Sequence, residues 1–96
     1  MMTTEDLAEL DIIRSMPNEV LSAQGILDFL DGTYMAYADM WDSEADVPEV
    51  VLTVGGLPMI ISEALNMPND KYRILEVHFE DSSLWRTCYI KAEYAE

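Results

Sequence analysis

The sequence is short of positive charge, and most of what it has comes late in the chain. Its 96 residues hold 19 acidic and 5 basic side chains, which gives a formal net charge of −14. Arg14 is the only base before Lys71, and residues 1–70 contain fourteen acids. Such a surplus creates a potential of several kT, which attracts cations and repels nucleic acid and anionic lipid. We therefore expect no direct binding to DNA, RNA or a membrane surface.

Cysteine and histidine occur once each, as Cys88 and His78. A lone cysteine cannot form an intramolecular disulfide, so nothing indicates an oxidising compartment. A lone histidine cannot build a histidine cluster for zinc. Both residues lie in alternating stretches whose pattern places them on different faces, which argues against a Cys–His nucleophile. The sequence therefore predicts a buried structural Cys88, no enzyme, no metal and no cofactor.

Long apolar runs are also absent. The longest, at 57–61, is far short of the roughly 20 residues that cross a membrane as a helix. Residues 1–6 have neither the basic nor the apolar part of a secretory signal. We therefore predict a soluble, cytoplasmic protein.

Bulky apolar side chains, in contrast, are plentiful. Half of the residues are hydrophobic, and they include two Trp, five Tyr, two Phe and seven Met. Disorder requires low hydrophobicity together with high charge, and only the second condition is met. The length suits one domain with a modest core. We predict a single acidic domain over residues 1–96.

The first half of the chain has helical periodicity. A first helix carries Leu7, Leu10 and Ile13 on one face. Residues 15–18 interrupt it, and Pro17 suits the first turn of a second helix. The apolar positions of that second helix are Val20, Ala23, Leu27, Leu30, Tyr34, Tyr37, Ala38 and Trp41. Gly32 weakens it, which leaves open one bent helix or two helices split at 31–33.

The middle of the chain contains a strand. Residues 50–54 are β-branched and apolar, and the glycines at 55–56 end the run. Residues 57–66 admit two interpretations, because short apolar runs are ambiguous by pattern alone. We favour a short helix over 59–66, and the alternative is a hairpin whose return strand includes 60–61.

Two alternating runs at 71–79 and 84–94 predict an antiparallel hairpin. The first run places Leu75, Val77 and Phe79 on one face. In the second run the aromatic residues Trp85, Tyr89 and Tyr94 form either a core face or the contact face of a homodimer. Helices followed by strands indicate an α+β fold, with N-terminal helices packed on a small antiparallel sheet that ends in a C-terminal β-hairpin.

The acids of the second helix share one face if that helix is continuous. The members of this acidic stripe are Asp28, Asp31, Asp39 and Asp42, with Met35 between them. They span about 21 Å, and neighbours three residues apart lie about 5–6 Å from each other, similar to phosphates along a nucleic-acid strand. Acidic helices usually interleave Lys or Arg at i+4, and residues 15–70 contain neither. The stripe is either a solvated face or an imitation of a phosphate backbone.

The loop after this helix places Asp42, Glu44 and Asp46 at alternate positions, as a calcium loop begins. An EF-hand loop requires Gly at its sixth position and Glu at its twelfth, where Val47 and Thr53 stand. We therefore interpret this loop as an extension of the anionic surface.

In size, charge and carboxylate layout the chain resembles small acidic inhibitors that imitate DNA, such as the antirestriction and anti-CRISPR proteins of phages and mobile elements. The resemblance implies that the acidic surface occupies the Lys/Arg-lined channel of a basic nucleic-acid-binding protein or complex. Tyr37 and Trp41 are either core aromatics or docking anchors beside that surface. The predicted partner-binding residues are Asp28, Asp31, Asp39, Asp42, Glu44, Asp46, Glu49, Tyr37 and Trp41. The alternative is a protein-interaction module without mimicry, such as an antitoxin, immunity protein or adaptor.

Overall fold

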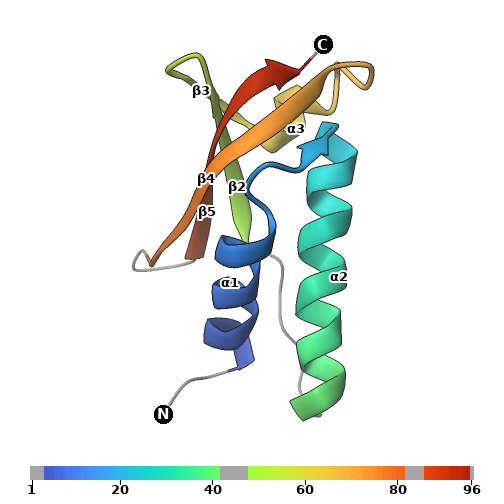
Figure 1. Ribbon diagram of the computed structural model, residues 1–96, viewed down its shortest axis with the longest axis vertical. Coiled ribbons are helices and arrows are strands. Elements are labelled where there is room, and N and C mark those ends of the chain that lie inside the picture. The colour runs from blue at the N-terminus through green and yellow to red at the C-terminus, as the bar shows by residue number, and fades with distance from the viewer. Residues whose placement is uncertain (1–3, 42–47, 82–85, 96) are drawn as a thin grey trace.

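A computed structural model describes residues 4–41, 48–81 and 86–95. The elements, in chain order, are α1 (Thr4–Ser15), β1 (Val20–Leu21), α2 (Ala23–Trp41), β2 (Glu49–Val54), β3 (Leu57–Ile60), α3 (Ile61–Ala64), β4 (Lys71–Asp81) and β5 (Arg86–Ala95). The strands of these residues form a five-stranded sheet in the order β1-β4-β5-β2-β3. Helices α1 and α2 pack against one face of it (Figure 1). The predicted α+β fold and its C-terminal hairpin, β4–β5, are confirmed.

The direction of one strand differs from the prediction. Strand β2 runs parallel to β5, whereas the other neighbouring strands are antiparallel. The sheet is therefore mixed and not purely antiparallel. Alternation of apolar and polar residues shows which face a side chain takes, but it does not reveal which strand lies beside it.

Helix α2 begins later than the sequence predicted. The prediction that Pro17 opens it is wrong, because the chain turns there, with Asn18 at a φ of 75°, and Val20 then pairs with β4. Ser22 caps the helix by accepting a hydrogen bond from the backbone N–H of Gly25 at 3.1 Å. From Ala23 onward the helix continues through Gly32 without a break. Of the two alternatives for this segment, the single helix is correct.

Residues 57–66 combine the two structures that we had considered as alternatives. Gly55 and Gly56 have φ values of 60° and 81°, which is the backbone of a type I′ hairpin turn, and β3 is the return strand. Helix α3 follows only from Ile61. The favoured helix over 59–66 is therefore wrong in its start, because the glycine turn pairs Met59 with Leu52 of β2.

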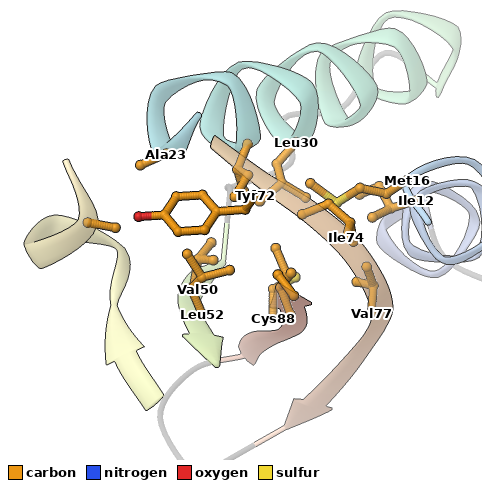
Figure 2. Close-up of a cluster of buried hydrophobic side chains, with 14 of the residues drawn as sticks. Ile12, Met16, Ala23, Leu30, Val50, Leu52, Tyr72, Ile74, Val77 and Cys88 are labelled. Atoms are coloured by element: carbon orange, nitrogen blue, oxygen red, sulfur yellow. The ribbon is translucent and has the colours of Figure 1, made fainter. Parts of the chain in front are cut away.

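The hydrophobic core lies between the helices and the sheet (Figure 2). Among its buried members are Ile12, Met16, Ile26, Leu30, Tyr34, Leu52, Ile74 and Ile90. In β4 the register shifts between Ile74 and Glu76, which is a β-bulge. The bulge leaves Leu75 39% exposed while Val77 returns to the core. The prediction that Leu75 shares a face with Val77 and Phe79 is therefore wrong. None of the helices in the described ranges is long and apolar enough to cross a membrane.

The hydroxyl of Tyr72 is buried with no hydrogen-bond partner among the described residues, and burial raises the pKa of this group. Figure 2 shows the ring between α2 and Val50. Replacing Tyr72 with Phe removes the unsatisfied group and keeps the ring. We expect the free energy of unfolding to rise by about 1 kcal/mol, which raises the thermal midpoint by about 4–8 °C. Tyr94→Phe, on the exposed ring beside it, is the control and should leave the midpoint unchanged. A lower midpoint for Tyr72→Phe would contradict this account.

Candidate partner-binding surface

Helix α2 presents the first part of the acidic stripe to solvent. Asp28 and Asp31 are exposed, and Met35 beside them is 50% exposed. On the other side of the same helix Ile26 and Leu30 are buried in the core, so the 3.6-residue period divides the helix into an inner and an outer face. Solvent exposure makes these two carboxylates available to a partner.

The remaining predicted site residues fall into four groups. Asp39 and Trp41 extend the backbone of α2, whereas Asp42, Glu44 and Asp46 lie outside the described residues. Tyr37 is half-buried and packs against the core. Glu49 is exposed at the start of β2, opposite Thr87, on the face of the sheet away from the helices. The structure therefore does not place Glu49 beside Asp28 and Asp31.

The two exposed carboxylates of α2 have no basic partner among the described residues. Asp28 accepts a hydrogen bond from the side-chain amide of Gln24 at 3.0 Å. The positions four residues after Asp28 and Asp31 hold Gly32 and Met35, neither of which can neutralise a carboxylate. Within the described residues, the ion pairs of the arginines involve other acids. The charge of this face is therefore left uncompensated.

Three of the four basic residues in the last 26 positions lie on the far side of the sheet from α2. Tyr72 points into the core, so its neighbours Lys71 and Arg73 lie on the opposite face of β4. Lys91 takes the same side in β5, next to the buried Ile90. The uncovered sheet face therefore carries both signs of charge, because these three cations share it with the carboxylates of Glu49, Glu76, Glu80 and Glu93.

An ion-pair network joins α1 to the hairpin β4–β5. Arg86 donates from Nη1 to Oε2 of the buried Glu9 at 2.7 Å, and it also donates to both carboxylate oxygens of Asp81. Nη1 of Arg86 lies 3.9 Å from Oδ1 of Asp6. The hydroxyl of Tyr34 donates to Glu9 at 3.4 Å. No local sequence pattern reveals this cluster, since Glu9 and Arg86 are 77 positions apart.

The surroundings of this network shift the pKa values of Glu9, Asp81 and Arg86. Burial raises the pKa of Glu9, although the Arg86 guanidinium opposes that rise. The hydrogen bond from Arg86 lowers the pKa of Asp81, and the same bond raises the pKa of the guanidinium itself. Asp81 and Arg86 are therefore charged near neutral pH, and the bonds from Arg86 to Glu9 and Asp81 join α1 to the sheet.

Cys88 and His78 lie on different faces of the hairpin, as the alternation predicted. Cys88 is buried beneath the helices, whereas His78 is exposed and stacks on Tyr89 with ring centroids 5.0 Å apart. Burial raises the pKa of the Cys88 thiol to about 12. This thiol is therefore protonated at neutral pH and has no access to a substrate. In the described ranges no group of three or more His, Cys, Asp or Glu side chains could hold a metal ion.

Cys88 should react with alkylating agents only when the protein unfolds. Because the thiolate is the nucleophile, we expect iodoacetamide at pH 8 to modify the folded protein at least about a hundredfold more slowly than the protein in concentrated urea. Mass spectrometry of timed samples measures both rates. Equal rates would contradict the burial of this thiol. We also expect Cys88→Ser to retain partner binding provided that the variant remains folded.

We compared the chain with protein-family models, with curated proteins and with solved structures. None of them matches it. The function must therefore be inferred from the chemistry of the surface.

Proposed function

We propose that this protein binds and inhibits a basic nucleic-acid-binding protein or complex by presenting carboxylates where that partner normally holds phosphates. In this proposal it acts as a phage-type antirestriction or anti-CRISPR inhibitor in the cytoplasm, which is the host's if a phage encodes it. It needs no cofactor and catalyses no reaction. The observation that supports the proposal best is the pair of uncompensated carboxylates, Asp28 and Asp31, on the exposed side of a continuous helix.

The continuity of α2 bears directly on mimicry. A helix rises about 1.5 Å per residue, so an unbroken helix holds its carboxylates at a fixed spacing along one line. Like charges three or four residues apart destabilise a helix by a few tenths of a kcal/mol per pair. This chain has such repulsion on α2 and places no Lys or Arg nearby. The carboxylates therefore do not stabilise the folded protein. Binding of a cationic partner would offset the repulsion.

The lack of bases on α2 supports the same function. Helix α2 contains no Lys or Arg, and Lys71, Arg73 and Lys91 lie on the other face of the sheet, so they pair with none of the described α2 carboxylates. The negative potential outside α2 attracts a basic channel, which speeds association at low salt.

Exposed apolar side chains favour a second candidate function, a protein-interaction module without mimicry. Met35 is 50% exposed within the acidic stripe, and Leu57 at the β2–β3 turn is 74% exposed. An antitoxin, immunity protein or adaptor would use such residues as the apolar centre of an interface. Its affinity would then depend on buried area more than on charge.

Affinity capture followed by salt titration separates the two functions. The tagged protein is incubated with bacterial lysate at about 50 mM and about 500 mM salt, and the captured partner is purified. Mimicry predicts a dissociation constant that rises steeply with salt and a partner whose own nucleic acid competes for binding. A shallow salt dependence without competition would favour the apolar module. Retardation of DNA or RNA by the protein itself would contradict both the mimicry and its electrostatic basis.

A further inference from the structure

Strand β4 has an open edge along its second half. The two residues of β1 pair only with Tyr72 and Arg73. Backbone hydrogen bonds from Asn18 to Ile74 at 2.7 Å and from Ile74 to Glu19 at 2.9 Å extend this pairing by one residue. Within the described ranges no strand pairs with this side of β4 from residue 76 to residue 81. Unpaired N–H and C=O groups at a sheet edge can receive a further strand.

A groove beside this open edge consists of two hollows, the first between β4 and α1 and the second along α1 itself. One hollow of about 360 Å³ is lined by Ile13, Pro17, Leu75, Glu76, Val77 and His78. A second hollow of about 250 Å³ is lined by Asp6, Glu9, Leu10 and Ile13. The two share Ile13, so together they follow α1 along its length. The floor is apolar, because Ile13 and Leu75 are each 39% exposed.

The β-bulge in β4 shapes the apolar part of this groove. Tyr72 and Ile74 face the core, so alternation places Leu75 outward beside Pro17, and the register shift after Ile74 leaves Glu76 outward as well and returns Val77 to the core. Bulges commonly occur at a sheet edge or next to a binding site. Here the bulge lies where β1 stops pairing and the open edge begins.

The charge beside the groove is negative. Glu76, Glu80 and Asp81 lie along the open edge and are exposed, and Asp6 lines the far hollow. Two bases lie near these acids: Arg86 is engaged with Asp81 and Glu9, and Lys91 lies opposite Glu76 in β5, while His78 lies 3.5 Å from Glu80. The acids Asp6, Glu9, Glu76, Glu80 and Asp81 outnumber these bases, so the edge keeps a net negative charge. A strand that is added here therefore gains from carrying Lys or Arg at alternate positions.

We propose that the open edge of β4 receives an extended, Lys- or Arg-bearing segment of the partner protein as an additional strand. Backbone hydrogen bonds to residues 76–81 give affinity, and an apolar side chain of the segment enters the hollow between Ile13 and Leu75. This inference rests on the proposed function in one respect, the basic character of the partner. It assigns a second contact surface, separate from the carboxylates of α2.

A second copy of this chain fits the edge poorly. Antiparallel pairing of two β4 strands about His78 would place Glu76 of one copy opposite Glu80 of the other, and like charges facing each other destabilise a sheet. Each copy also carries a net charge of −14. The opposite edge of the sheet, β3, contains Pro58, which lacks the N–H that an added strand would use. A cationic segment at β4 brings opposite charge to the exposed acids, and its backbone can pair with the unpaired N–H and C=O groups of the edge.

The test uses the whole protein, labelled with nitrogen-15, and two synthetic heptapeptides. One alternates lysine with valine, and the other alternates glutamate with valine. We expect the lysine peptide to shift the amide signals of residues 76–81 and of Ile13, and to slow hydrogen exchange along the edge by at least about tenfold. The glutamate peptide should cause no such changes. Shifts confined to the outer face of α2, or no shifts at all, would overturn the proposal.

A matched pair of variants separates strand addition from attraction to negative charge in general. Glu76→Gln/Glu80→Gln and Asp28→Asn/Asp31→Asn remove the same number of exposed carboxylates from different places. We expect the first to weaken binding of the lysine peptide by about tenfold and the second by less than about twofold. Equal weakening by both would overturn the edge as the site. Because the β4 and α2 carboxylates are changed in separate variants, this result is independent of whether α2 binds the captured partner.

The apolar hollow is tested in the same way. Leu75→Asn should weaken binding of the lysine peptide by about fivefold, because a valine of the peptide loses its apolar contact. Ile60→Asn changes a similarly exposed strand residue at the opposite edge and should have no effect. An effect of Ile60→Asn equal to that of Leu75→Asn would contradict a specific hollow.

Discussion

Replacing Asp28, Asp31, Asp39 and Asp42 with Asn should weaken binding to the captured partner by more than about tenfold while slightly stabilising the protein. The substitutions keep size and shape and remove only charge. Stability rises because neighbouring carboxylates no longer repel, and affinity falls because fewer ion contacts form. The salt dependence should flatten for the same reason.

The matched control changes four exposed carboxylates elsewhere, Asp11, Glu19, Glu63 and Glu93, to their amides. Both variants then have the same net charge. Calorimetric titration across a range of salt concentrations gives the dissociation constants, and urea unfolding gives the stabilities. If the stripe variant keeps its affinity at low salt, the acidic stripe is a solvated face. The apolar surface or the β4 edge must then carry the interaction.

Replacing Arg86 with Met should destabilise the fold by about 3 kcal/mol, because the buried carboxylate of Glu9 would lose its counter-ion. The thermal midpoint should fall by more than about 10 °C. Arg73→Met is the control, since its partner Glu93 is half-exposed, and it should cost less than about 1 kcal/mol. Equal losses for the two arginines would show that Glu9 is not effectively buried.

Two further measurements identify the cause of that loss. Glu9→Gln combined with Arg86→Met removes both charges and should recover most of the stability, because no uncompensated buried charge remains. The pKa of Glu9 is already raised above 4.5, and removing Arg86 raises it further. A raised carboxyl pKa destabilises the fold above that pKa and has no effect below the unfolded value. The deficit of Arg86→Met should therefore shrink as the pH falls from 7 toward 4.5.

Local patterns predicted only some of the helical and strand faces of this protein. In α1 the prediction was wrong, because the buried face holds Ala8 and Ile12, whereas Ile13 of the predicted face is 39% exposed. Alternation correctly placed Cys88 inward and His78 outward, and the 3.6-residue period placed Asp28 and Asp31 outside α2. The uncertainty at Gly32 could not be removed from the sequence. Burial of Leu30 and Tyr34 on either side of this glycine stabilises the continuous helix, and that burial is a tertiary effect.

Features that depend on distant pairing could not be predicted. Val20 and Leu21 are too few to form a recognisable strand pattern, and they are a strand only because Tyr72 and Arg73 lie opposite. The bulge at Leu75 breaks the alternation that a pattern must assume. For the candidate site, the exposure of the α2 carboxylates followed from periodicity. The position of Glu49 on the other face did not, since β2 sets it by pairing with β5.

The position of β5 between β4 and β2 has a consequence for how the protein is made. Both neighbours of β5 are synthesised before it. The edges of β4 and of the hairpin β2–β3 that will pair with β5 therefore stay unpaired until β5 has left the ribosome. Helices α1 and α2 can meet earlier, because they are close in sequence. The sheet must then close in one late step, during which exposed edges can associate with other nascent chains. Mutual repulsion between chains of net charge −14 keeps them apart in that interval.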